Sequence, residues 1–217
     1  MPAREQTTMR LLTLLLAATL ALHAQTPTHP TSTPYTGDLS IFEDPARDQK
    51  LQIDRVMDTL NLHPGSSIAD IGAGGGWFTV RAAKRVGATG HVFAEDINPS
   101  AVDAIRARAI KENLLNIQPW LGTPDDPRLP PASLDAALML RVYHEIAHPP
   151  LLLASLFASM KPGARLVIID HPGHGDDHGI NPDIVIAEVQ RSGFHFVKQF
   201  DFTKADQNDY LLLFTKP

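Results

Sequence analysis

From residue 44 to the C-terminus, short apolar runs alternate with stretches whose apolar residues recur at helical spacing. The run LDAALML at residues 134–140 does not alternate with polar residues, which is typical of a strand buried on both faces of a parallel sheet. The predicted strands are residues 66–72, 91–96, 117–122, 134–140, 164–170, 194–202 and 209–215. The predicted helices are residues 44–60, 77–86, 98–112, 150–160 and 181–193.

The predicted helix starts carry local signals. Asp44, Asn98 and Asn181 each precede a proline, which places a capping side chain before a residue suited to the first helical turn. Only a short polar loop separates the last two strands, so no crossover helix fits and they should be antiparallel. The order predicts an α/β fold with a doubly wound, Rossmann-like sheet of seven strands, mostly parallel with an antiparallel C-terminal strand.

The N-terminal part differs in character. Arg4 and Arg10 are followed by an apolar run at 11–24, which as a helix would be roughly 21 Å long and too short to span a bilayer. Residues 1–24 are therefore predicted to be a secretory signal peptide, which implies an exported or periplasmic protein. The alternative is a membrane-anchoring or amphipathic helix on a cytoplasmic protein. Residues 25–43, rich in Thr and Pro, are predicted to be a flexible linker before a domain at 44–217.

Composition narrows the chemistry. The net charge of −5 argues against a protein that binds nucleic acid by charge, and membrane contact is expected only through the leader. The chain has no cysteine, which excludes disulfides, thiolate metal sites and a cysteine nucleophile. The reactive group must therefore come from His, carboxylates, hydroxyls or a cofactor.

A glycine-rich turn follows the first predicted strand. Glycines at 72, 74, 75 and 76 would let the backbone turn tightly and approach a ligand. The dinucleotide fingerprint would need a glycine at 77, where Trp77 stands, so a nucleoside ligand without a pyrophosphate is favoured. At the end of the second strand, Asp96 is placed to accept hydrogen bonds from ribose hydroxyls.

Four segments in order resemble motifs of the class I S-adenosylmethionine-dependent methyltransferases, in particular the quinone-biosynthesis-like, type 11 group. They are DIGAGGG at 70–76, VFAEDI at 92–97, LPPASLD at 129–135 and MKPGARL at 160–166. The resemblance implies S-adenosylmethionine as cofactor and methyl transfer to a small-molecule acceptor.

The resemblance also implies roles for individual residues. Asp70 and the loop Gly72–Gly76, in particular Gly72, Gly74 and Gly76, would hold the methionine moiety, and Asp96 the ribose. An acid after the third strand usually contacts the adenine amine; Asp125 is the candidate here, with Asp126 as the alternative. Arg141 would border the methionine moiety.

Residues after the fourth predicted strand are the catalytic candidates. Tyr143, His144 and Glu145 would border the acceptor, and His144 or Glu145 would act as general base if the acceptor is a hydroxyl. The sequence HEIAH at 144–148 also matches a zinc-protease motif, but that motif needs a continuous helix and Pro149 disfavours helical geometry at His148.

A second histidine cluster, HPGHGDDHG at 171–179, has a composition that could bind a divalent metal or supply one histidine to the acceptor. The simpler interpretation is a polar loop near the mouth of the site, and no metal is predicted. The main alternative functions are an exported domain that binds S-adenosylmethionine or its demethylated product without catalysis, and a metal-dependent hydrolase.

Overall fold

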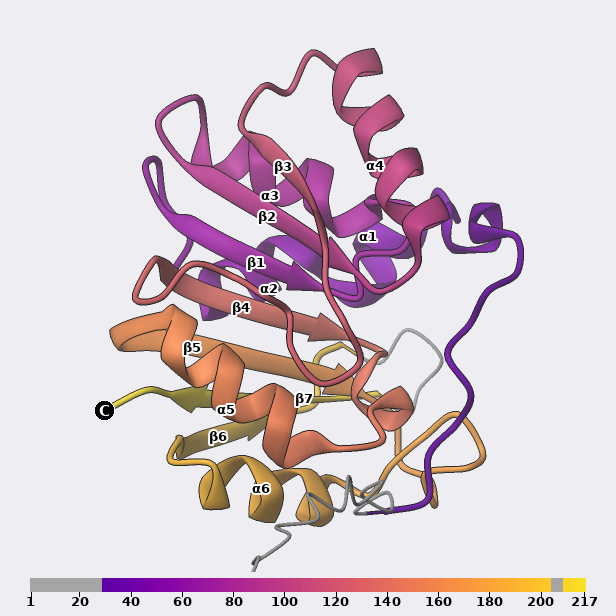
Figure 1. Ribbon diagram of the computed structural model, residues 1–217, viewed down its shortest axis with the longest axis vertical. Coiled ribbons are helices and arrows are strands. Elements are labelled where there is room, and N and C mark those ends of the chain that lie inside the picture. The colour runs from indigo at the N-terminus through magenta and orange to yellow at the C-terminus, as the bar shows by residue number, and fades with distance from the viewer. Residues whose placement is uncertain (1–28, 204–208) are drawn as a thin grey trace, which may run out of the picture.

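The computed structural model describes residues 29–203 and 209–217, so the predicted signal peptide and residues 25–28 lie outside the described residues. Its centre is one seven-stranded sheet in the order β3-β2-β1-β4-β5-β7-β6 (Figure 1). The strands are β1 (Ser67–Ile71), β2 (His91–Asp96), β3 (Ile117–Leu121), β4 (Leu134–Leu140), β5 (Met160–Asp170), β6 (His195–Phe200) and β7 (Tyr210–Thr215).

The strand directions confirm the predicted fold class. Neighbouring strands from β3 to β5 are parallel, whereas β7 runs antiparallel to both β5 and β6. The strand order reverses between β1 and β4, and the carboxyl ends of these strands form the crevice in which open α/β sheets bind ligands. β3 contains Pro119, which an edge strand tolerates because one side of its ladder is unpaired.

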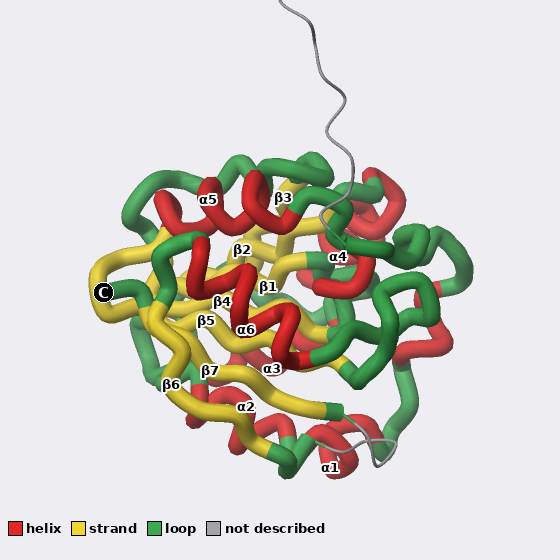
Figure 2. The backbone as a smooth tube through the Cα atoms, turned by 90° about the horizontal axis from the view of Figure 1, so that it is seen from below, coloured by secondary structure: helices red, strands yellow, loops and turns green. Residues whose placement is uncertain are grey.

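Helices cover both faces of the sheet (Figure 2). On one face the core packs α1 (Arg47–Leu51), α2 (Ile53–Thr59), α3 (Trp77–Val86) and α4 (Pro99–Lys111) against the strands, and on the other α5 (Pro149–Ser159) and α6 (Pro182–Arg191). The side chains of Asn98 and Asn181 cap α4 and α6, as predicted. Two 3₁₀ helices, η1 (Leu39–Phe42) and η2 (Tyr143–Glu145), lie near the carboxyl edge of the sheet.

The first predicted helix is broken rather than continuous. Gln52 adopts a left-handed conformation (φ 48°) that separates α1 from α2. Leu51 and Ile53 are both buried, and in one uninterrupted helix two residues two positions apart would point to nearly opposite sides. The break lets both side chains enter the same core, which a reading of local spacing does not reveal.

Residues 29–43, called the N-terminal strap below, lie along the carboxyl edge of the sheet (Figure 1), contrary to the expectation of a flexible linker. At one end His29 is buried, and its Nδ1 is 3.0 Å from Glu188 Oε1 of α6. Ser32 is also buried, and its N–H donates to His144 O at 3.0 Å. These contacts reach residues over 100 positions away, so they fix a segment that has no pattern of its own.

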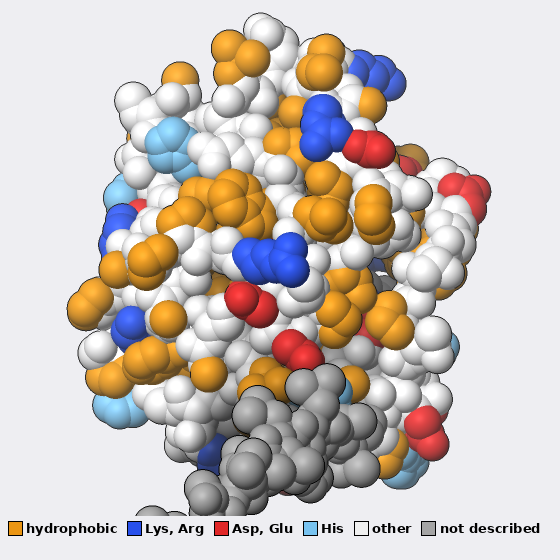
Figure 3. All heavy atoms as spheres, viewed as in Figure 1, with side chains coloured by type: hydrophobic (Ala, Val, Ile, Leu, Met, Phe, Trp, Pro, Cys, Tyr) orange, Lys and Arg blue, Asp and Glu red, His pale blue; other side chains and the backbone are white. Residues whose placement is uncertain are grey.

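Surface charge is relevant to binding of nucleic acid, and helix length and apolar character are relevant to contact with a membrane. On the part of the face in Figure 3 that the structure describes, Lys and Arg side chains are scattered among Asp and Glu and form no continuous basic patch. Within residues 29–203 and 209–217, no helix has the length and apolar character needed to cross a bilayer.

Candidate active site

A cavity of about 920 Å³ lies at the carboxyl edge of the sheet, where the strand order reverses. Its floor is formed by the ends of β1, β2 and β4 with the loops that follow them. The N-terminal strap and the start of α1 form the opposite wall. A pocket of this size is at the upper end of the range of small-molecule and cofactor sites.

The glycine turn has the backbone that the sequence predicts. Gly72 and Gly74 have φ values of 67° and 55°, and both line the cavity. A Cβ on Gly72 would lie 2.6 Å from a methyl carbon of Val142, so only glycine fits there. Gly76 (φ 76°) caps the start of α3 and does not line the cavity. The turn thus brings bare backbone to the cavity at Gly72 and Gly74.

Two buried carboxyl groups lie under this turn. Asp70 is 2% exposed and accepts a 2.6 Å hydrogen bond from the Thr79 hydroxyl; burial raises its pKa to about 7. Glu95 is also 2% exposed, and its Oε1 has no hydrogen-bond partner and packs against Gly122. Burial and the neighbouring charge of Asp96 raise the pKa of Glu95 to about 8. Both carboxyls line the cavity, so they suit a cationic or hydrogen-bond-donating ligand.

Asp96 lies where the predicted ribose contact should be. Its Oδ2 accepts from the Gly74 N–H at 2.9 Å, and its Oδ1 accepts from the Asn98 N–H at 2.8 Å. Each carboxylate oxygen can accept a further hydrogen bond, so Asp96 can hold the glycine turn and a pair of ligand hydroxyls at once.

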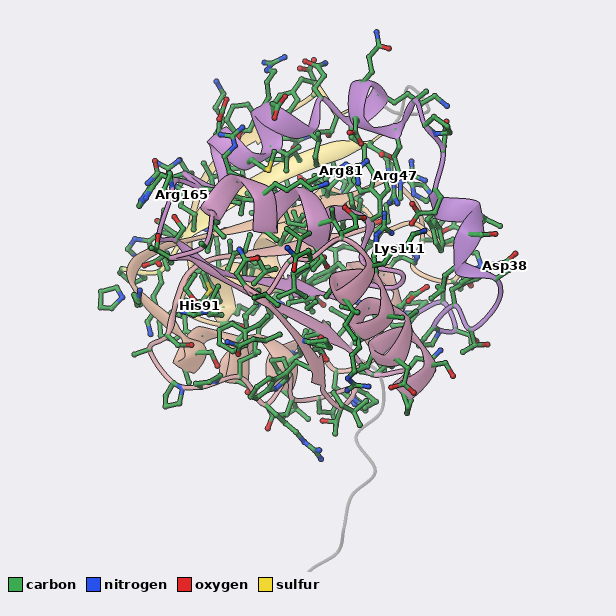
Figure 4. All side chains as sticks on the ribbon, turned by 90° about the horizontal axis from the view of Figure 1, so that it is seen from above. Asp38, Arg47, Arg81, His91, Lys111 and Arg165 are labelled. Carbon is green, nitrogen blue, oxygen red and sulfur yellow. The ribbon has the colours of Figure 1, made fainter. Side chains whose placement is uncertain are left out.

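Arg47 and Trp77 complete the wall beside Asp70, and the sequence did not single out Arg47. The Trp77 ring lies between two guanidinium groups, 4.3 Å from Arg47 and 4.1 Å from Arg81. Burial lowers the pKa of Arg47 to about 10, and it still carries a positive charge at neutral pH. Figure 4 shows Arg47 and Arg81 on the same side of the molecule, away from His91 at the amino end of β2. Arg47 lines the cavity, where its charge suits a ligand carboxylate.

The predicted adenine contact, Asp125, is not brought to the cavity. Thr123 and Pro124 line the wall after β3, whereas the Asp125 carboxylate is 2.9 Å from His148 Nδ1. Asp126, the alternative, accepts from the Arg128 N–H and the Ser155 hydroxyl instead. The turn after β3 therefore offers the cavity the Thr123 side chain and backbone groups rather than an acid.

Arg141 lines the cavity as predicted, but its side chain is already engaged. Its guanidinium makes a bidentate ion pair with Asp209, with Nη2 2.8 Å from both carboxylate oxygens. The Asp209 side chain is fully buried, and Arg141 has a positive φ of 57°. Arg141 thus ties the turn after β4 to the residue just before β7.

The three catalytic candidates point in different directions, because consecutive side chains diverge in a 3₁₀ turn. Tyr143 is fully buried, does not line the cavity and donates its hydroxyl to Glu188 Oε2 at 2.9 Å, so the structure contradicts a catalytic role for it. Glu145 lines the cavity. His144 is 4% exposed behind it, with Nδ1 2.9 Å from Asp170 Oδ1.

The pKa values of His144 and Glu145 are shifted by burial and by nearby charges, including that of Asp170. Burial lowers the pKa of His144, but the hydrogen bond and charge of Asp170 raise it more, so the net shift is upward. Burial raises the pKa of Glu145, and the charge of His144 opposes that shift. Of the residues predicted to be catalytic, only Glu145 presents its side chain to the cavity.

The HEIAH segment does not form a zinc-protease helix. Residues 143–145 form η2, Ile146 is extended, and His148 has φ −128° and ψ 67° as the residue before α5. His144 and His148 are therefore not on one helical face, as the following prolines predicted.

Comparison with known proteins agrees with this site. Residues 68–163 match a family model described as a methyltransferase domain. An uncharacterized 37.1 kDa protein in a transposon of Streptomyces fradiae is 32% identical over 137 residues, 63% of this chain and 38% of that protein. A ubiquinone/menaquinone biosynthesis C-methyltransferase of Hydrogenovibrio crunogenus is 27% identical over 110 residues, 50% of this chain and 43% of the relative. The chain thus spans about two fifths of the length of these curated relatives.

A solved structure of a SAM-dependent methyltransferase from Aquifex aeolicus has the same fold. It superimposes with a TM-score of 0.75 at 22% identity and covers 84% of this chain and 100% of its own. The matched segment contains the glycine turn, Asp70, Asp96 and the strand after them. Residues 68–163 are therefore similar to a methyltransferase domain, and the chain has the fold of a solved SAM-dependent methyltransferase.

Proposed function

We propose that this protein transfers a methyl group from S-adenosylmethionine to a small, lipophilic acceptor by in-line displacement. The observation that carries the proposal is the single cavity wall that combines the Gly72–Gly74 turn with the carboxylate of Asp96. S-adenosylmethionine supplies the methyl group on a positively charged sulfur. The chain has to hold that cation, align the acceptor and exclude water.

The charges around the cavity support a cationic ligand. Four carboxyl-bearing residues of the sheet edge line it, namely Asp70, Glu95, Asp96 and Glu145. Arg47 stands beside Asp70 and suits the carboxylate end of a methionine moiety. A cationic sulfur favours the ionised form of a nearby carboxyl, so its binding should shift the pKa of Asp70 and Glu95 downward from about 7 and about 8.

The rest of the cavity supports a lipophilic acceptor. Apolar side chains of the N-terminal strap, of the end of β4 with the turn after it and of α5 contribute to its lining. The apolar residues there are Leu39, Phe42, Leu140, Val142, Ile146 and Leu152. The curated relative from Hydrogenovibrio crunogenus acts in quinone biosynthesis, and a quinone precursor has the apolar character that this wall would accept.

Two measurements test the proposal. Calorimetry should detect binding of S-adenosylhomocysteine to the wild-type chain and much weaker binding to Asp96→Ala. Release of label from methyl-labelled S-adenosylmethionine into a lipid extract should then require the same residue. Binding without transfer to any extract would favour the non-catalytic alternative, and absence of binding would refute both.

Export by an N-terminal signal peptide is a separate proposal. It is supported by Arg4 and Arg10 before the apolar run at 11–24. Cell fractionation with N-terminal sequencing of the mature chain tests it: a chain that begins after residue 24 in an exported fraction is expected. An intact N-terminus on a cytoplasmic protein would contradict it.

A further inference from the structure

We propose that His144, Glu145 and His178 bind one divalent transition-metal ion at the wall of the cavity. The three residues offer one ligand atom each, and these atoms all lie within 4.8 Å of one another. Two loops bring them together, since His144 and Glu145 follow β4 and His178 lies in the histidine-rich loop after β5. The His144 and His178 rings meet edge to face, with centroids 5.9 Å apart.

His144 is oriented as metal-binding histidines are. Its Nδ1 lies 2.9 and 3.0 Å from the two Asp170 oxygens, and its backbone N–H donates to Asp170 Oδ2. Because a carboxylate only accepts, Nδ1 carries the proton and Nε2 is left as the atom with a free lone pair. Nε2 is on the side of Glu145, 3.9 Å from its Oε1. A carboxylate behind a ligating imidazole is the usual supporting contact in metal sites.

The N-terminal strap contacts all three proposed ligands. The Ser32 N–H donates to His144 O at 3.0 Å, and the Ser32 hydroxyl accepts from the His178 N–H at 2.8 Å. The Tyr35 N–H donates to Glu145 Oε1 at 3.2 Å. The strap therefore fixes the relative position of all three ligands and holds His178, an exposed residue, close to the buried His144.

The donor set indicates the kind of ion. Two imidazoles and one carboxylate suit Zn²⁺ and its first-row neighbours, whereas Mg²⁺ and Ca²⁺ prefer oxygen ligands throughout. Three protein ligands leave a coordination position open, and Glu145 lines the cavity, so that position is on the cavity side. The ion would hold an oxygen of a bound molecule there. The site uses no residue of the glycine turn, so metal binding can be measured separately from S-adenosylhomocysteine binding.

Metal titration of the full chain tests the proposal. Protein freed of metal with a chelator is titrated with ZnCl₂ by calorimetry and with CoCl₂ by visible absorption. One equivalent of Zn²⁺ should bind to the wild type, and His178→Ala should lower its affinity by at least about 10-fold. Asp170→Asn should lower it by about 10- to 100-fold, the usual effect of losing a supporting carboxylate.

His174→Ala is the matched control, because His174 is in the same loop but its side chain is 91% exposed and contacts Asp177. It should bind Zn²⁺ as the wild type does. S-adenosylhomocysteine binding by each variant reports folding and the cofactor site separately. The proposal is overturned if the wild type binds no Zn²⁺, or if His178→Ala binds as tightly as His174→Ala. Zn²⁺ binding in a chain that binds no S-adenosylhomocysteine would refute the proposed function and leave the metal site standing.

Discussion

The free energy of unfolding should fall as the pH rises, in part because of the raised pKa of Glu95. Replacing Glu95 by Gln should remove that contribution. In the folded chain burial raises the pKa of Glu95 to about 8, against 4.5 for an ordinary glutamate. Between these values the folded state keeps a proton that the unfolded chain has lost. The stability that this protonated carboxyl contributes is therefore complete below pH 4.5 and is lost as the pH rises through about 8.

The size of the effect follows from the shift. Each pKa unit corresponds to about 1.4 kcal/mol, so ionisation of the unfolded chain lowers the free energy of unfolding by about 3 kcal/mol between pH 4.5 and neutrality. Glutamine does not titrate, so Glu95→Gln should lack this decline. At the acid end the two proteins should be similar in stability, since the protonated carboxyl and the amide are nearly equal in shape.

Urea unfolding of the ligand-free chain, followed by circular dichroism at several pH values between about 5 and about 8, measures the slope. Glu112→Gln is the control: Glu112 pairs with Lys84 and Arg108 on the surface, and the Lys84 contact lowers its pKa. Its pKa is 4.5 in an ordinary glutamate and lower in the folded chain, so both values lie below this pH range and the control should nearly keep the wild-type slope. Equal slopes for Glu95→Gln and wild type would show that Glu95 is ionised in the folded chain and would refute the reasoning.

Four further substitutions separate cofactor binding from packing. Asp96→Ala should weaken S-adenosylhomocysteine binding in calorimetry by about 10- to 100-fold through lost charge-assisted hydrogen bonds; an unchanged affinity would remove Asp96 from the site. Gly72→Ala should lower the free energy of unfolding by about 2 to 5 kcal/mol, because it adds a steric clash to left-handed strain. Gly163→Ala, at φ 77° in open space, should cost only about 1 to 2 kcal/mol, and equal costs in urea would contradict the clash. Tyr143→Phe should cost about 1.5 to 3 kcal/mol of stability through its bond to Glu188, with cofactor affinity and turnover unchanged; a selective loss of turnover would restore a catalytic role.

Local pattern was enough to predict the fold. The apolar run at 134–140 forms β4 with the predicted bounds, and the second strand and the helix at 77–86 also match. Asn98 and Asn181 cap their helices because an asparagine before a proline is a purely local signal. The break at Gln52 escaped prediction because it depends on where the core lies, which only the tertiary structure decides.

Residues of the site could be predicted from the sequence only where the residue type itself indicates the backbone geometry. Gly72, Gly74 and Asp96 lie at the cavity because a turn and a strand end place them there. Tyr143 was misplaced because sequence adjacency to Glu145 does not fix the direction of a side chain in a 3₁₀ turn.

The N-terminal strap and Arg47 gave no signal in the sequence. Their positions come from long-range contacts such as His29 with Glu188 and Ser32 with His178.

The strap also has a kinetic consequence. Its residues from Thr31 to Glu43 form one wall of the cavity, and its far end is fastened to α6 through His29. In the proposed reaction, the spent cofactor has to leave this cavity once in every cycle. Contacts that fasten the strap, such as the hydroxyl of Ser32 on the loop after β5, therefore lengthen the residence time of the product.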